Sequence, residues 1–130
     1  MNAGGSPIET VVYGIKNCDT MKKAFAWLDA QGVAYRFHDY RKSGIDTATL
    51  QRWCDALGWE ALMNRRGTTW RKLSAEQQAI ATAAEAIALM QSNTSLIRRP
   101  VIEFDGAPAG LLLGFDADHY ARTLRPAHNP

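Results

Sequence analysis

The chain has 130 residues, of which 46% are apolar and 22% are charged. This length fits one domain with a sizeable core, and this composition is typical of a globular protein rather than a disordered one. The formal net charge of +2 comes from 15 basic and 13 acidic residues and is too small to indicate nucleic-acid binding.

The sequence carries no targeting signal that we can recognise. The first residues have neither a basic start nor a long apolar stretch, so we expect no signal peptide. No segment approaches the length that spans a bilayer. Two cysteines that do not look paired favour a reducing compartment. We therefore expect a cytoplasmic protein that binds neither membrane nor nucleic acid.

The first part of the chain predicts a strand, a helix and a second strand. After a loose leader over residues 1–8, an apolar run predicts a strand over 9–14. A helix is expected over 18–31 and ends at Gly32, which serves as a C-terminal cap. Alternating side chains over 33–40 predict the second strand, and a crossover between such strands is right-handed.

Helices are expected next. Asp46 is a plausible N-cap for a helix over 47–57, and residues 59–63 predict a further short helical turn. Ser74 and Gln77 resemble a capping box, and the helix that follows them should end near Asn93.

The C-terminal part predicts a hairpin and a final helix. Strands over 101–104 and 111–113 flank Asp105-Gly106, a hairpin turn signal. The last helix is expected over about 116–124, followed by a polar tail over 126–130. The order is β-α-β, a helical insertion over about 45–93, then β-β-α. This is an α/β, thioredoxin-like fold with a mixed sheet, which we expect to form a single domain over 1–130.

The most informative residue is Cys18. An apolar stripe with helical spacing follows it, so the thiol lies where a helix begins: Met21, Ala24, Phe25 and Leu28. Unpaired amides and the helix dipole favour an anion there, which lowers a thiol pKa and makes the sulfur nucleophilic. The alternative is a small buried hydrophobe. Cys54 fits that alternative because it belongs to an apolar helical stripe, and we expect no disulfide between the two cysteines.

Basic residues gather in three groups, which together hold nine of the fifteen Lys and Arg: Lys16, Lys22 and Lys23; Arg65, Arg66, Arg71 and Lys72; Arg98 and Arg99. If the fold brings the groups together, they form a cationic pocket. If it does not, they are solvated surface charges, the commoner fate of these residues. Three scattered histidines and two separate cysteines lack metal-ligand spacing, so we expect no metal site.

Four motifs, in this order and at these separations, resemble the glutaredoxin-linked arsenate reductase (ArsC) and Spx family, in particular its YffB-type subgroup. The similarity covers about residues 9–124, and the motifs lie at residues 13–24, 64–71, 97–101 and 113–116. The resemblance implies a thioredoxin-like core with a helical insertion. It also implies that Cys18 is the nucleophile and that Arg66 and Arg99 bind an anion. The Arg99–Pro100 peptide bond is expected to be cis, which costs an X-Pro bond only about 0.5–1 kcal/mol.

The sequence also departs from the family. Gly14 stands where arsenate reductases have a histidine, and Leu113-Gly114-Phe115 stands where a further arginine is expected. Met21 replaces the second cysteine of the Spx Cys-x-x-Cys motif, so an internal disulfide switch is not available.

Three functions remain open at this stage. The first is a glutathione-dependent thiol oxidoreductase with Cys18 as its single catalytic cysteine; Lys16, Lys22, Arg66, Arg99 and Pro100 would bind the substrate. The second is an arsenate-type oxyanion reductase with the same cysteine. The third is a non-enzymatic, Spx-like protein-binding module. We expect no bound cofactor, glutathione or a small anion as the small-molecule partner, glutaredoxin as a protein partner, and a monomer.

Overall fold

The structure, a computed structural model, describes residues 10–16, 18–104 and 110–124. The leader over 1–8, the turn at Asp105-Gly106 and the tail over 126–130 lie outside the described residues. The chain divides into two compact units, one formed by Met1–His38 with Arg99–Pro130 and the other by Asp39–Arg98. Each unit is described by itself below. A single domain with an insertion over about 45–93 stays a prediction.

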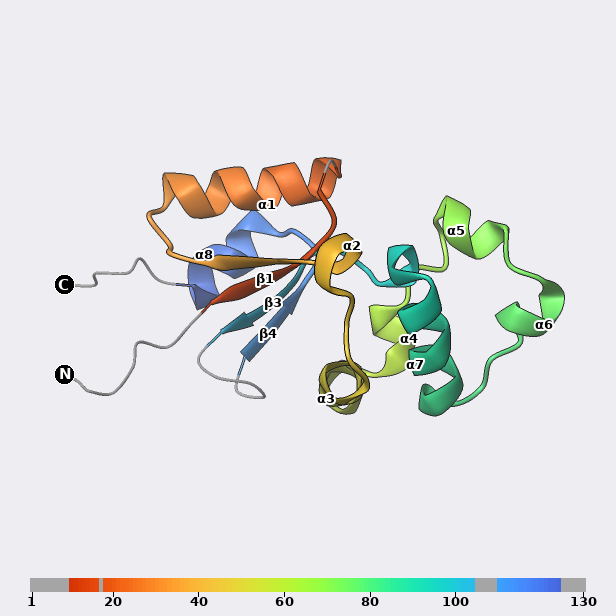
Figure 1. Ribbon diagram of the computed structural model, residues 1–130. Coiled ribbons are helices and arrows are strands. Elements are labelled where there is room, and N and C mark those ends of the chain that lie inside the picture. Colours follow the sequence, from red (N-terminus) through yellow and green to blue (C-terminus); the bar gives the residue numbers. More distant parts are fainter. Residues whose placement is uncertain (1–9, 17, 105–109, 125–130) are drawn as a thin grey trace. The chain divides into compact units, whose positions relative to one another are not determined.

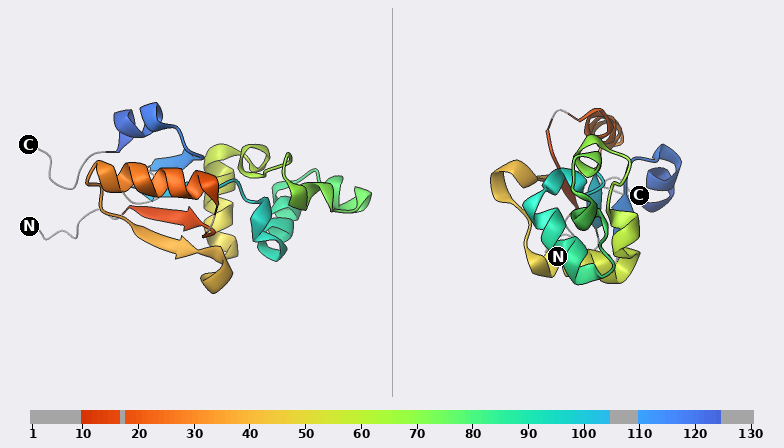
Figure 2. Two further views of the ribbon diagram at one scale, coloured as in Figure 1. Left: turned by 90° about the horizontal axis from the view of Figure 1, so that it is seen from above. Right: turned by 90° about the vertical axis from the view of Figure 1, so that its right-hand side faces the viewer.

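The first unit is built on a four-stranded sheet in the order β2-β1-β3-β4. Its elements are β1 (Val11–Gly14), α1 (Asp19–Ala30), β2 (Arg36–Asp39), β3 (Val101–Phe104), β4 (Gly110–Leu113) and α8 (Ala117–Thr123). β1 pairs antiparallel with β3, and β3 pairs antiparallel with β4. The arrowheads of β1 and β2 point the same way (Figure 2), so the sheet is mixed. The α/β, thioredoxin-like prediction is confirmed.

α1 and α8 cover one face of this sheet (Figure 1). The shared core contains buried side chains from both helices, from three strands and from two residues that follow the helices: Val12, Met21, Ala24, Leu28, Val33, Ile102, Leu112, Tyr120 and Leu124. The predicted stripe of α1 is therefore its buried face. Full burial of one large apolar side chain is worth about 1.5–3 kcal/mol, so this stripe fixes α1 on the sheet.

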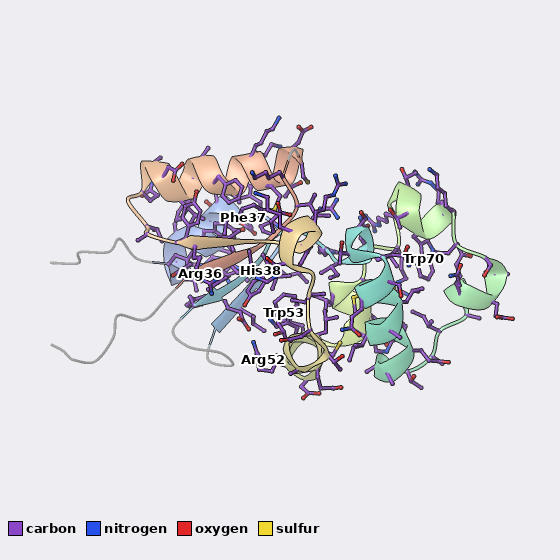
Figure 3. The ribbon with its side chains drawn as sticks, in the orientation of Figure 1. Arg36, Phe37, His38, Arg52, Trp53 and Trp70 are labelled. Atoms are coloured by element: carbon purple, nitrogen blue, oxygen red, sulfur yellow. The ribbon has the colours of Figure 1, made fainter. Side chains whose placement is uncertain are left out.

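β2 is shorter than predicted. The expectation of a strand over 33–40 is wrong at both ends, because the ladder to β1 begins where the Arg36 N–H donates to the Thr10 carbonyl at 2.9 Å. At the other end Asp39 accepts a hydrogen bond from the Arg41 N–H and caps α2 (Tyr40–Ser43). The predicted alternation is nonetheless present. Phe37 lies on the α1 side of the strand, and Arg36 and His38 lie on the opposite side (Figure 3).

The second unit is helical: α2, α3 (Thr47–Leu57), α4 (Trp59–Leu62), α5 (Thr68–Arg71), α6 (Ala75–Gln78), α7 (Ala83–Ser92) and the 3-10 turn η1 (Thr94–Leu96). α3 begins after Asp46, whose carboxylate accepts a hydrogen bond from the Thr49 N–H, as predicted. α3 and α7 are joined where Gln91 accepts a hydrogen bond from Thr47 and donates one to the Ile45 carbonyl.

The single helix predicted from Ser74 to about Asn93 is two separate helices in the structure, α6 and α7. The Ser74 capping box is present, but its helix α6 spans four residues, and the continuous helix from there to Asn93 is wrong. A second capping box, formed by Thr82 and Glu85, starts α7 separately. Because each box satisfies the free amides of its own first turn, the chain gains a new helix start at Thr82. In the part of the chain that the structure describes, no helix has both the length and the apolar character needed to cross a membrane.

Candidate active site

Cys18 is the N-cap residue of α1. Its backbone is extended, with φ −109° and ψ 132°, and its carbonyl accepts the first helical hydrogen bond, from the Lys22 N–H at 3.0 Å. The side chain is half-buried and packs against the edge of the core of the first unit. The predicted placement of the thiol at a helix start is therefore correct. The residue is only partly buried at the start of the helix.

The surroundings of Cys18 favour its ionised form. Burial opposes ionisation, but three groups together outweigh it and lower the pKa of the thiol below its ordinary value: the Met21 N–H, the Arg99 side chain and the Thr20 N–H. Cys18 makes no side-chain capping hydrogen bond of ordinary geometry, so the amides act as donors toward the developing thiolate. A thiol with a lowered pKa and partial exposure has the two properties that a nucleophilic cysteine needs.

Arg99 lies beside this thiol. Arg99 both hydrogen-bonds the sulfur through its side chain and acts on it as a nearby positive charge. The Arg99–Pro100 bond is cis, as the family resemblance implies. The Pro100 carbonyl accepts a hydrogen bond from the Gly114 N–H at 2.8 Å, and the Gly114 carbonyl accepts one from the Tyr120 hydroxyl. Gly114, which precedes α8, and Tyr120 of α8 thus support the segment that follows the arginine.

The two predicted lysines contribute differently from Arg99. Lys16 and Lys22 are exposed. Neither is among the groups that lower the pKa of Cys18. Both lie in the first unit, one before the cysteine and one in the first turn of α1, so they stay predicted contacts for an anionic substrate.

Arg66 belongs to the second unit and stays a predicted substrate-binding residue. It is exposed, and its segment is held by its neighbours: the Arg66 N–H donates to the Asn64 side chain at 3.1 Å, and Arg71 donates to the Arg66 carbonyl at 2.9 Å. Arg65 lies over the Trp59 ring, with its guanidinium carbon 5.8 Å from the ring centroid. That distance is within the range of cation–π contacts.

Cys54 contrasts with Cys18. It is 7% exposed on α3, which confirms its predicted core position. Burial, with further contributions from Asp55 and Glu60, raises the pKa of the Cys54 thiol. Both cysteines are free. Among the described residues, no three His, Cys, Asp or Glu side chains form a group that could hold a metal ion.

Sequence reasoning missed the roles of Thr20 and Met21 at this site. Their backbone amides, rather than the lysines, join Arg99 in stabilising the thiolate. The available signal was their spacing, because positions two and three after an N-cap are the ones whose amides face its side chain. Met21 was predicted to lie in the buried stripe, where it is indeed completely buried.

The fold is a thioredoxin-like fold of the arsenate reductase-related class. The ArsC family model matches residues 13–123, and the chain belongs to the ArsC family. A solved structure of a YffB protein is 51% identical with a TM-score of 0.83, and the match covers 88% of this chain and 98% of that one. A solution structure of an arsenate reductase (ArsC) related protein from Brucella melitensis is 45% identical with a TM-score of 0.70, over 93% and 98%.

A more distant relative is the global transcriptional regulator Spx of Streptococcus mutans. It is 28% identical over 88 residues, which are 66% of this chain and 64% of the regulator. The chain therefore spans slightly less than two thirds of that protein.

Proposed function

We propose that this protein is a glutathione-dependent thiol oxidoreductase that uses Cys18 as its single nucleophile. The observation that supports the proposal most directly is the half-buried Cys18 thiol with a lowered pKa beside Arg99. Membership of the ArsC family and the similarity to an arsenate reductase related protein also support a thiol-dependent function. We propose the cytoplasm, where thiols stay reduced, as its location.

The proposed reaction is two thiol–disulfide exchanges. The Cys18 thiolate attacks the glutathione sulfur of a mixed disulfide, so that a Cys18–glutathione bond forms and the substrate leaves as a thiolate. The thiolate of a second glutathione then attacks the glutathione sulfur bound to Cys18, which releases Cys18 and oxidised glutathione. In the net exchange the substrate sulfur is reduced to a thiol and one glutathione thiol is oxidised, and the two glutathione groups leave as oxidised glutathione. Such exchange proceeds through a mixed disulfide and is fastest when the attacking thiol has a pKa near the ambient pH.

External glutathione is required because the chain offers no suitable second thiol. The residue three positions after Cys18 is Met21, which cannot form a disulfide. Cys54 is buried, and burial raises its pKa, so it is a poor attacking group.

Charge-assisted contacts would hold the glutathione. We assign its carboxylates to Arg99 and Lys22, with Lys16 nearby in sequence, and retain Arg66 and Pro100 as substrate-binding residues from the family resemblance. Arginine pairs with carboxylates through two parallel hydrogen bonds, which are among the stronger polar contacts in proteins. Glutaredoxin is the proposed protein partner and would recycle a mixed disulfide at Cys18.

The test is steady-state reduction of a small glutathione mixed disulfide, coupled to NADPH consumption by glutathione reductase. We expect turnover in the wild type and in Cys54→Ser, and none in Cys18→Ser. Turnover that persists in Cys18→Ser, or its absence in the folded wild type, would contradict the proposal.

Arsenate reduction is the second candidate, favoured by the Cys18–Arg99 pair and by the similarity to an arsenate reductase (ArsC) related protein. Cys18 would displace water from arsenate, and glutathione would attack the cysteine sulfur, leaving arsenite and a mixed disulfide. The same coupled assay with arsenate in place of the disulfide tests it. No turnover with either substrate would instead favour a binding module like the Spx relative.

A further inference from the structure

The backbone of Gly14 is in direct contact with the Met21 side chain, and this contact has no role in the reaction derived above. A Cβ atom added to Gly14 would lie 2.5 Å from the Met21 Cε and closer still to its Sδ. Gly14 is not among the glycines with positive φ, which are Gly32, Gly44, Gly58 and Gly114 in the described chain. Glycine is therefore needed at this position for space and not for its backbone conformation.

Met21 has little freedom to move out of the way. Although methionine is flexible, this side chain is completely buried in the core that α1 shares with the sheet. Protein interiors are close-packed, so a displaced side chain would have to push its neighbours as well. A new methyl group at position 14 would instead shift the first turn of α1 away from the end of β1.

That first turn carries the groups that act on the sulfur. The Met21 N–H is the largest of the contributions that stabilise the Cys18 thiolate, and the Thr20 N–H adds to it. The side chain of Met21 thus contacts β1, while its amide, at the third position after the Cys18 N-cap, favours the Cys18 thiolate. A hydrogen bond weakens steeply as distance and angle depart from the optimum, so a small shift of the turn matters.

We propose that Gly14 and Met21 are an interlocked pair of positioning residues, in which the methionine packed on bare glycine backbone holds the first turn of α1 against the Cys18 sulfur. The proposal deepens the proposed function, since it explains how the nucleophile is prepared. Its readout is the ionisation of Cys18, which can be measured without glutathione. Failure of the glutathione reaction and failure of this proposal are therefore distinguishable.

The experiment measures the pH dependence of Cys18 alkylation, mapped by peptide mass spectrometry, in Gly14→Ala, Met21→Ala and the double variant. We expect each single substitution to raise the pKa of Cys18 by about one unit, a tenfold change in the thiol–thiolate equilibrium. Adding Gly14→Ala to Met21→Ala should cause no further rise, because the atoms that the new methyl group would meet are gone. Contacting residues that act together give such non-additive effects.

A matched control is Gly110→Ala. A Cβ at Gly110 would also meet a packed side chain, lying 2.5 Å from the Phe104 Cε2, but this contact lies between β3 and β4. We expect it to lower stability and leave the pKa of Cys18 unchanged. If Gly14→Ala loses stability like Gly110→Ala and keeps the wild-type pKa, the proposal is wrong. If Gly14→Ala does not fold, an unchanged Cys18 pKa in Met21→Ala overturns it equally well.

Discussion

Replacement of Arg99 by alanine should raise the pKa of Cys18 by about one unit. Arg99 acts on the sulfur as a hydrogen-bond donor and as a positive charge. A hydrogen bond to a charged group is worth about 1.5–3 kcal/mol, and the lower end applies here because both side chains are only half-buried. At 1.36 kcal/mol per pKa unit, the loss corresponds to about one unit, which is about a tenfold change in the thiol–thiolate equilibrium constant.

The assay is the rate of Cys18 alkylation from acid to alkaline pH, read from the Cys18 peptide alone. Arg98→Ala is the matched control, because it removes the same charge from the adjacent, exposed position. It should shift the pKa by much less. Arg99→Lys should give an intermediate value, since lysine keeps the charge and loses the planar fork of donors. Equal shifts in Arg98→Ala and Arg99→Ala would refute the argument, because the effect would then be one of net charge.

Three further outcomes follow from the structure. The pKa of Cys18 in the folded protein lies below its unfolded value of about 8.5. The unfolding free energy of the wild type relative to Cys18→Ser should therefore rise with pH and level off above about 8.5, and this extra stability should be lost as pH falls through the folded-state pKa. Denaturant titrations that give a pH-independent difference between the two proteins would contradict this. Thr82→Ala should cost about 1 kcal/mol of unfolding free energy by removing the α7 cap, whereas the exposed Thr68→Ala should cost under about 0.5 kcal/mol. Tyr13→Phe removes the 2.8 Å hydrogen bond to the buried Glu103 carboxylate and should lower the unfolding free energy by about 1–3 kcal/mol, measured by thermal or denaturant unfolding. A loss below about 0.5 kcal/mol would show that this hydrogen bond contributes little to stability.

Local chemistry made much of the fold predictable. The helix over 47–57 follows from Asp46 and Gly58, which give a cap at each end of an amphipathic run. α1 follows from its apolar stripe and from Gly32, whose φ of 70° suits a helix C-terminus. The C-terminal end of β2 and the Ser74 helix were predicted too long for the same reason. Asp39 and Thr82 cap new helices inside runs whose hydrophobic pattern continues, and pattern alone does not show where such a cap prevails.

The candidate site divides in the same way. Cys18 was found because its position relative to an apolar stripe is a local property of the sequence. The pairing of Cys18 with Arg99 joins residues 81 positions apart and came only from the family resemblance. The effect of the Met21 amide on Cys18 and the packing of the Met21 side chain on Gly14 were not predictable from local sequence. Both depend on how closely α1 approaches β1, which the tertiary structure determines.

We expect the sulfur at the start of α1 to be the reactive one. This expectation is tested by incubating the native protein with oxidised glutathione at neutral pH and then measuring the intact mass and mapping the modified peptides. One glutathione per chain, attached at position 18 while position 54 stays unmodified, is the expected product. A protein that stays unmodified, or that reacts at both cysteines at similar rates, would contradict the account.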